Sequence, residues 1–181
     1  AGTPFGRLEF LLLGGSAIPQ NLVKKLQAIS TACYSSYAMT ETATHIALRK
    51  LNGPGASEFY HCLDDIEVEL SKAGCLRIKM PGLEKPLQTN DLAELQDKKT
   101  FQVLGRADNI IISGGIKFSP EQLEKKLEPY IKQPFMISWL PHEMLGQQLI
   151  LLVEGNQSAE TNQKLQHILH LTFVLYMRRA L

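Results

Sequence analysis

Two short segments near the start of the chain carry residues that could bind a flat, anionic ligand. Gly14-Gly15-Ser16-Ala17 follows an apolar run, and glycines allow a ligand to approach the backbone and its amides. The second segment offers the ring of Tyr37 for stacking, the hydroxyl of Thr40 for a phosphate oxygen, and the carboxylate of Glu41 for Mg²⁺. Together these groups match the parts of a nucleotide.

Two further residues stand apart along the chain. Asp91 could accept hydrogen bonds from a ribose diol, and Arg106 could reach the same sugar or an acyl phosphate. Taken singly, each candidate also has a structural interpretation: a tight turn for the glycines, a core edge for the tyrosine, and a salt bridge for Asp91 and Arg106. Motifs this short have many false positives, so the residue types alone leave both interpretations open.

The elements around the first two segments resemble the parts of an open α/β sheet. The apolar run from Leu8 to Leu13 predicts a fully buried parallel strand, which ends at the glycines. A helix is expected to open at Pro19, with apolar residues on one face. Residues 32–37 predict a second strand that runs into the Tyr37 loop, and such loops bound the crevices in which these sheets bind ligands.

From about Ile66 the apolar residues alternate with a period of two, which predicts antiparallel strands. One hairpin is expected from Ile66 to Met80 with its turn at Ala73-Gly74, and a second strand pair over residues 92–95 and 101–104. These strands fit a small β subdomain.

The composition changes again after Gly105. Ser119 can cap a helix that begins at Pro120 and ends near Leu127, with Gln122 completing a capping box. Strands are expected near residues 135–139 and 148–153, and a further helix over residues 159–171. The pattern predicts a second, compact α+β unit.

Composition excludes several classes of protein. Nineteen Lys and Arg against 18 Asp and Glu give a net charge of +1, so there is no global field to hold nucleic acid or an anionic membrane. No apolar run approaches the roughly 20 residues that span a bilayer. The three cysteines are widely spaced, which favours reduced thiols in the cytoplasm over disulfides or zinc. The chain starts at Ala1 and not at Met, which leads us to expect a piece of a longer protein.

Taken in order, the motifs resemble the core motifs of adenylate-forming acyl-CoA synthetases, and within that superfamily most closely those of 2-succinylbenzoate:CoA ligases of menaquinone biosynthesis. The motifs are Gly14-Gly15-Ser16-Ala17, Ser36-Tyr37-Ala38-Met39-Thr40-Glu41, Thr89-Asn90-Asp91, Gly105-Arg106-Ala107-Asp108-Asn109 and Ser113-Gly114-Gly115. The resemblance implies a mixed α/β fold with three parts. Residues 1–59 would be an α/β segment of the large adenylating domain, 60–105 its antiparallel β subdomain, and 106–181 a mobile α+β C-terminal domain.

The resemblance also implies the chemistry. ATP and a carboxylate would give an acyl-adenylate and pyrophosphate, and the thiol of coenzyme A would then displace AMP. Gly15, Ser16 and Ala17 would line the adenine and acyl pocket. Tyr37 would stack on adenine, Thr40 would contact phosphate, and Glu41 would hold Mg²⁺. The partners would be these small molecules and, at most, further copies of the chain, with no nucleic acid and no membrane insertion.

The remaining roles implied by the resemblance fall around the domain boundary. Asp91 and Arg106 would clasp the ribose hydroxyls, and Asp108 would be the hinge about which the C-terminal domain rotates. A loop that meets coenzyme A would be formed by Ser113, Gly114, Gly115 and Lys117.

The chain departs from the family pattern at several points. The phosphate-gripping loop and the adenylating lysine segment of the family have no counterpart in it, so we expect a C-terminal fragment that is inactive in adenylation by itself. Ala38 and Asn90 stand where the family usually has glycine. Two alternatives remain open: a ligase for another aryl or fatty carboxylate, and a non-catalytic nucleotide-binding module.

Overall fold

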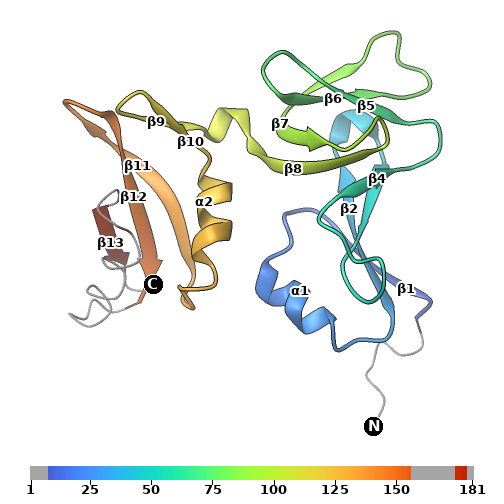
Figure 1. Cartoon of the computed structure of the whole chain (residues 1–181), viewed down its shortest axis with the longest axis horizontal. Helices are drawn as coiled ribbons and strands as arrows, with labels where there is room; N and C mark the ends of the chain where they lie inside the picture. Colours follow the sequence, from blue (N-terminus) through green and yellow to red (C-terminus); the bar gives the residue numbers. More distant parts are fainter. Residues whose placement is uncertain (1–7, 156–173, 179–181) are drawn as a thin grey trace. The chain divides into compact units, whose positions relative to one another are not determined.

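The computed structural model describes residues 8–155 and 174–178 of the chain (Figure 1). The chain divides into two compact units, Ala1–Val103 and Leu104–Leu181, and each is described here by itself. The helix expected over residues 159–171 lies outside the described residues. The residue ranges that we expected for the three parts of the fold remain a prediction.

The first unit contains one eight-stranded sheet with strand order β1-β2-β3-β4-β8-β7-β6-β5, except for the last three residues of β8, which belong to the second unit. Its strands are β1 (Phe10–Leu13), β2 (Ala32–Ala38), β3 (His45–Lys50), β4 (Tyr60–Cys62), β5 (Glu67–Leu70), β6 (Cys75–Lys79), β7 (Leu87–Leu95) and β8 (Thr100–Arg106). β1 is parallel to β2, and β2, β3, β4 and β8 pair antiparallel in turn. Strands from residues 1–59 and from residues 60–105, which we expected to form two parts, therefore share one continuous sheet.

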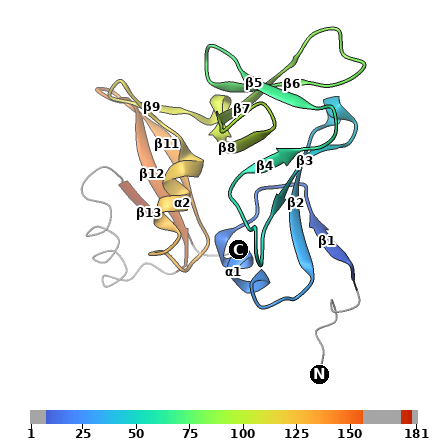
Figure 2. The ribbon, with the colours of Figure 1, turned by 45° about the vertical axis from the view of Figure 1, so that its right-hand side comes forward.

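The first strand is parallel, as predicted, but the expectation that it is fully buried was wrong. Phe10 is 57% exposed and Leu12 is 38% exposed. β1 is the edge strand of the sheet, and its side chains alternate between two faces. Only the face with Leu11 and Leu13 packs with helix α1 (Gln20–Leu26), which covers this end of the sheet (Figure 2).

The alternating patterns further along the chain are confirmed as strands. β5 and β6 form the expected antiparallel hairpin, in which Val68 pairs with Ile78. β7 and β8 are neighbours, as expected, although β7 starts five residues earlier than residue 92. We did not predict β3 and β4, yet they join the two halves of the sheet. The core here includes Ile46, Leu76 and Phe101, all fully buried.

The second unit contains a smaller sheet and a capped helix. Its strands are β9 (Ile111–Ser113), β10 (Ile116–Phe118), β11 (Phe135–His142), β12 (Gly146–Glu154) and β13 (Val174–Arg178), in the order β10-β9-β12-β11 with β13 paired to β12. Helix α2 (Pro120–Leu127) lies against β11 (Figures 1 and 2). The predicted cap is confirmed, because the Ser119 hydroxyl accepts a hydrogen bond from the Gln122 amide. α2, β11 and β12 enclose a core that contains Ile137, Leu149 and Leu151.

Candidate functional site

The glycine segment and the start of the tyrosine segment lie side by side, at the carboxyl ends of parallel strands. Leu13 at the end of β1 pairs with Ser35 of β2, and the Ser36 hydroxyl donates to the Leu13 carbonyl at 3.4 Å. A Cβ on Gly14 would lie 2.6 Å from the Ser36 oxygen, so any larger residue there would require the Ser36 side chain to move. Gly15 has φ +93° and open space around it. The two segments therefore form one edge of the sheet, of the kind at which α/β proteins bind ligands.

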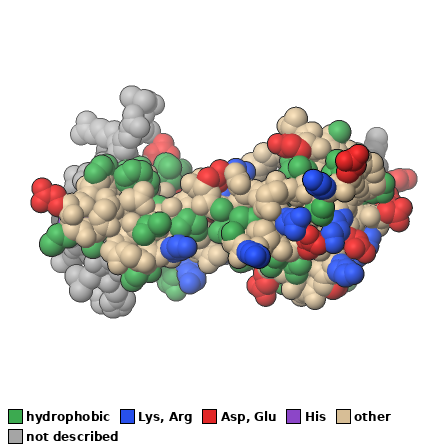
Figure 3. Space-filling view, turned by 90° about the horizontal axis from the view of Figure 1, so that it is seen from above, with side chains coloured by type: hydrophobic (Ala, Val, Ile, Leu, Met, Phe, Trp, Pro, Cys, Tyr) green, Lys and Arg blue, Asp and Glu red, His purple; other side chains and the backbone are tan. Residues whose placement is uncertain are grey.

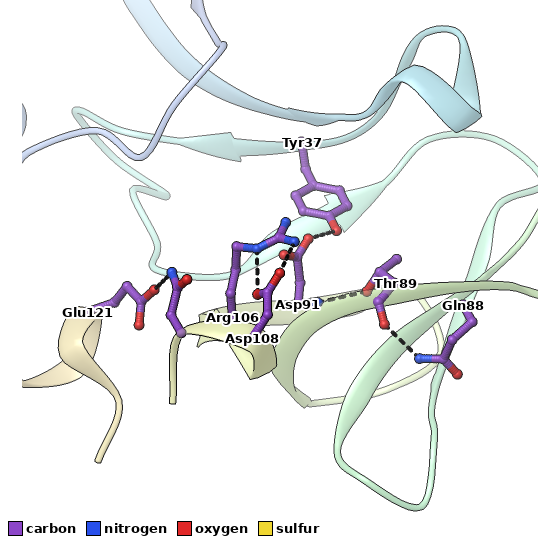
Figure 4. Close-up of polar contacts among 8 residues, drawn as sticks. Tyr37, Gln88, Thr89, Asp91, Arg106, Asp108 and Glu121 are labelled. Atoms are coloured by element: carbon purple, nitrogen blue, oxygen red, sulfur yellow. Dashed lines mark hydrogen bonds and ion pairs between the residues drawn. The ribbon is translucent and has the colours of Figure 1, made fainter. Parts of the chain in front are cut away.

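Tyr37 and Asp91, 54 residues apart in the sequence, are in direct contact (Figure 4). The Tyr37 hydroxyl donates a hydrogen bond to the Asp91 carboxylate. Asp91 lies within β7 and is 8% exposed, which corrects the expectation that it precedes the strand. Alternation along β7 turns Thr89 and Asp91 inward, and the Thr89 hydroxyl accepts from the Asp91 amide at 3.1 Å. The Thr89 hydroxyl itself donates to the Leu76 carbonyl at 2.9 Å, which anchors β7 to β6.

An aromatic cluster behind Tyr37 was missed by the sequence reasoning. The ring of Tyr37 meets the rings of Tyr60 and Phe101 edge-on, with centroids 5.9 and 5.3 Å away. Tyr60 stacks on Phe101 and shares a 3.0 Å hydrogen bond with the Ser35 hydroxyl. Such contacts restrict the ring of Tyr37 to one orientation. A shift in the β2–β3 register between Tyr37 and Ala38 bends the strand at the same point.

Thr40 and Glu41 lie on a short 3-10 turn, η1 (Thr40–Thr42), and both are exposed. The turn is held by Thr42, which we had not singled out. Thr42 is 2% exposed. Its hydroxyl lies within hydrogen-bond distance, 2.9 Å, of two acceptors, the carbonyls of Met39 and Thr44. Ala43, with φ +57°, closes the turn. Thr40 and Glu41 are thereby presented to solvent from a fixed backbone.

The donor set of this turn fits a magnesium ion that arrives with phosphate. Residues 8–155 and 174–178 contain no group of three or more His, Cys, Asp or Glu side chains that could hold a metal. Mg²⁺ usually takes one or two protein carboxylates and completes its octahedron with phosphate oxygens and water. A single exposed carboxylate at Glu41, next to the Thr40 hydroxyl, meets that requirement.

In the second unit, Arg106 and Asp108 form a bidentate ion pair (Figure 4). The Arg106 Nε donates to Asp108 Oδ1 at 2.9 Å, and a terminal guanidinium nitrogen donates to Oδ2 at 2.7 Å. Both side chains are 49% exposed, so this pair is screened by water and contributes little to stability. Its geometry orients the Arg106 side chain along the start of η2 (Ala107–Asn109).

The backbone before this ion pair is tightly packed. Gly105 has φ +149°, and a Cβ on it would lie 2.6 Å from a carboxylate oxygen of Glu121 and 2.7 Å from the Ser119 oxygen. Glu121 in turn accepts a 2.6 Å hydrogen bond from the Asn109 amide group. Gly105 and the first turn of α2 thus flank the proposed hinge residue Asp108.

The expected coenzyme A loop is a β-hairpin turn. Ser113 pairs with Ile116, which leaves Gly114 and Gly115 as a two-residue turn with φ of +56° and +81°. Positive φ at both positions is typical of a type I′ turn, which is why two glycines occur here. Lys117 follows on β10 and is exposed.

The structure brings some of the predicted residues together within each unit. Tyr37 and Asp91 meet in the first unit, where the glycine segment lies at the end of β1 beside Ser36. Arg106 is assigned to the second unit, so its meeting with Asp91 stays a prediction.

Three other features concern the cysteines, the surface charges and the lengths of the helices. All three cysteines are free, and burial raises the pKa of the Cys62 thiol to about 11, which disfavours a thiolate nucleophile at that position. On the face of the first unit seen in Figure 3, Lys and Arg side chains are interspersed with Asp and Glu. Among the contacts of this unit, Arg77 and Lys79 both form ion pairs with Glu69. None of the helices among the described residues is long and apolar enough to cross a membrane.

Comparison with known proteins decides the family. No protein-family model matches the chain. A 2-succinylbenzoate–CoA ligase of Lactococcus lactis is 32% identical over 94% of this chain and 41% of its own length. An AMP-forming acyl-CoA synthetase-like structure from Dyadobacter fermentans is 33% identical, with a TM-score of 0.57, over 98% of this chain and 54% of that one. The chain belongs to the adenylate-forming acyl-CoA synthetases.

Within this superfamily, the fold is shared with enzymes solved in complex with their ligands. The o-succinylbenzoate CoA synthetase of Bacillus subtilis, solved with the acyl-adenylate OSB-AMP, is 22% identical with a TM-score of 0.68, over 92% of this chain and 42% of that one. The same enzyme has been solved with ATP and a magnesium ion. The chain spans about two fifths of the length of the L. lactis ligase, one of the curated relatives that it matches.

Proposed function

We propose that the chain forms the adenosine-binding edge and the coenzyme A loop of a 2-succinylbenzoate–CoA ligase, acting in menaquinone biosynthesis in the cytoplasm. The observation that carries this proposal is the contact between Tyr37 and the buried carboxylate of Asp91. It brings together the aromatic ring and the acid that the superfamily pattern assigns to one nucleoside. The curated relatives with this name support the choice of acid.

In the proposed first half-reaction, the carboxylate oxygen of the substrate attacks the α-phosphorus of ATP, and pyrophosphate leaves. Asp91 accepts hydrogen bonds from the ribose hydroxyls, and the ring of Tyr37 lies against the base. The Thr40 hydroxyl donates a hydrogen bond to a phosphate oxygen, and the Glu41 carboxylate would hold a Mg²⁺ ion, which would neutralise phosphate charge. Gly15, Ser16 and Ala17 line the pocket, where the missing side chain of Gly15 leaves space for the ligand.

In the second half-reaction, the thiol of coenzyme A loses its proton to solvent and forms a carbon–sulfur bond to the acyl carbon, and AMP leaves as the acyl carbon–oxygen bond breaks. We assign the contact with the thiol-bearing arm to Ser113, Gly114, Gly115 and Lys117. Arg106 binds the ribose or the phosphate, and Asp108 is the hinge between the two steps. The Arg106–Asp108 pair is exposed and exchangeable, as a hinge that changes partners requires.

The test is a chimera in which this chain replaces the aligned 41% of the L. lactis ligase, with the flanking residues of that enzyme retained. We expect ATP-dependent thioester formation from 2-succinylbenzoate in preference to benzoate or a fatty acid. Asp91→Ala removes a charged hydrogen-bond acceptor worth about 1.5–3 kcal/mol, so adenylation should fall roughly 10- to 100-fold.

The matched control is Asn90→Ala, because Asn90 is exposed on the opposite face of β7. It should leave adenylation within about twofold of the parent chimera. A folded chimera with a preference for another acid overturns the substrate assignment. Equal rates for Asp91→Ala and Asn90→Ala overturn the nucleotide site.

A further inference from the structure

A second turn lies directly against the glycine turn of the β9–β10 hairpin. This is the β11–β12 turn, residues 143–145, and Gly146, which follows it, pairs with Ser113. Its Leu145 carbonyl accepts a hydrogen bond from the Gly114 amide at 3.0 Å. The side-chain carbonyl of Gln147 accepts one from the Ile112 amide at 2.6 Å.

We propose that Gln147 is a positioning residue, which holds the Gly114-Gly115 turn in the shape that receives the thiol-bearing arm of coenzyme A. This inference rests on the proposed function of that turn. Gln147 acts through the backbone of β9, at the Ile112 amide, and touches no reacting atom.

The β9–β10 hairpin needs this support because its own strands are short and mostly exposed. β9 and β10 have three residues each, and a two-stranded hairpin of this length is marginal in water. Ile112 is 47% exposed and Ile116 is 61% exposed, whereas Ile111 is buried at 2%. One buried side chain on β9 anchors the base of the hairpin but leaves its tip to polar contacts.

The Gln147 side chain supplies an acceptor for β9 that the backbone of its own strand, β12, does not. The pairing between β12 and β9 is a single pair, Gly146 with Ser113. At the next position along β9, the Gln147 side chain takes the place of a backbone carbonyl as acceptor for Ile112. This hydrogen bond from backbone to side chain therefore prolongs the β9–β12 pairing by one bond.

The supporting turn is itself held in one conformation. The Nδ1 atom of His142 accepts hydrogen bonds from the amides of Met144 and Leu145, at 3.2 and 3.3 Å. The Leu145 side chain lies over the glycine turn, 3.2 Å from where a Cβ on Gly114 would be. A turn fixed in this way can transmit its geometry to Gly114, which lowers the ordering cost when coenzyme A binds.

The expected effect follows from the loss of one hydrogen bond. Gln147→Leu is one atom shorter but of similar volume, and it removes the acceptor oxygen. The net contribution of one such bond corresponds to a change of about two- to tenfold in an equilibrium constant. We therefore expect coenzyme A to bind this variant about two- to tenfold more weakly, with AMP binding unchanged.

The experiment uses the 181-residue chain, with amide exchange and ligand titrations followed by NMR. The probes are coenzyme A and AMP, at 0.15 M ionic strength, about the physiological value. We expect Gln147→Leu to lose protection at the Ile112 amide and to bind coenzyme A more weakly. Gln147→Glu keeps an acceptor oxygen and should restore both. Gln148→Ala is the control, because the next residue on β12 points to the other face.

The possible outcomes distinguish a failure of the Gln147 inference from a failure of the proposed function on which it rests. Unchanged protection at Ile112 in Gln147→Leu overturns the inference, as does lost protection with unchanged affinity for coenzyme A. If the parent chain binds AMP but coenzyme A moves no resonance of residues 113–117, the assigned role of the glycine turn is wrong, and the positioning role falls with it. If the parent chain does not bind AMP, the proposed nucleotide site is contradicted instead.

Discussion

Replacing Gly105 with alanine tests the packing around the proposed hinge. Gly105 has φ +149°, a conformation that costs a residue with a Cβ on the order of 1–3 kcal/mol. The new Cβ would also lie 2.6 Å from Glu121 and 2.7 Å from Ser119, so both side chains must move. Since Ser119 caps α2, its displacement should cost roughly another 1 kcal/mol, and the overpacking about 1–3 kcal/mol.

Gly155 provides a matched control for the backbone strain. Its φ is +143°, and nothing lies within 4 Å of where its Cβ would be. Gly155→Ala therefore introduces the backbone strain of a positive φ but no steric clash with a neighbouring side chain. The difference in free energy of unfolding between the two variants should be at least about 2 kcal/mol, or roughly 8–16 °C in the melting temperature of a unit of this size.

The assay is thermal unfolding of the two variants and the parent chain, followed by calorimetry. Gly105→Ala should melt well below Gly155→Ala, and amide protection in the first turn of α2 should fall. Equal melting temperatures would refute the reasoning, because they would show that Ser119 and Glu121 yield without loss of the cap.

Three further predictions concern buried or partly buried polar groups. Burial raises the pKa of Glu124 above its ordinary 4.5, so the folded state binds this proton more tightly than the unfolded chain does. Stability therefore falls as the pH rises from 4.5 through the raised pKa, and in urea denaturation Glu124→Gln should gain stability relative to the parent over that rise. The pKa of Cys62, about 11 against an ordinary 9.0, should slow alkylation at pH 8 about 100-fold relative to the unfolded chain, as measured by mass spectrometry. The Asn52 side chain, 3% exposed, bonds the Cys33 amide at 2.8 Å and three backbone carbonyls, so Asn52→Ala should cost about 2–4 kcal/mol in urea unfolding, with the exposed Asn90→Ala as control.

Much of the local structure could be predicted because it depends on neighbours in the sequence. The hairpin around Gly74 follows from alternating side chains, and the start of α2 follows from Ser119 and Pro120. The motif order also predicted the family, because five short segments in a fixed order are far more specific than any one of them.

The features that were missed depend on contacts between distant residues. β1 has the composition of a central strand, and only the strand order makes it an edge. The cluster of Tyr60 and Phe101 behind Tyr37 requires β4 and β8 to be neighbours, which no local pattern shows. The inward orientation of Asp91 could have been found by extending the alternation of β7 back to Leu87.

The central claim is that Tyr37 and Asp91 bind one adenosine group, and titration of AMP into the 181-residue chain tests it most directly. We predict that AMP shifts the NMR resonances around both residues, and that Asp91→Ala weakens the affinity at least about tenfold. Asn90→Ala should bind AMP as the parent does. If AMP leaves those resonances unmoved, or if Asp91→Ala binds AMP as tightly as Asn90→Ala, the claim is contradicted.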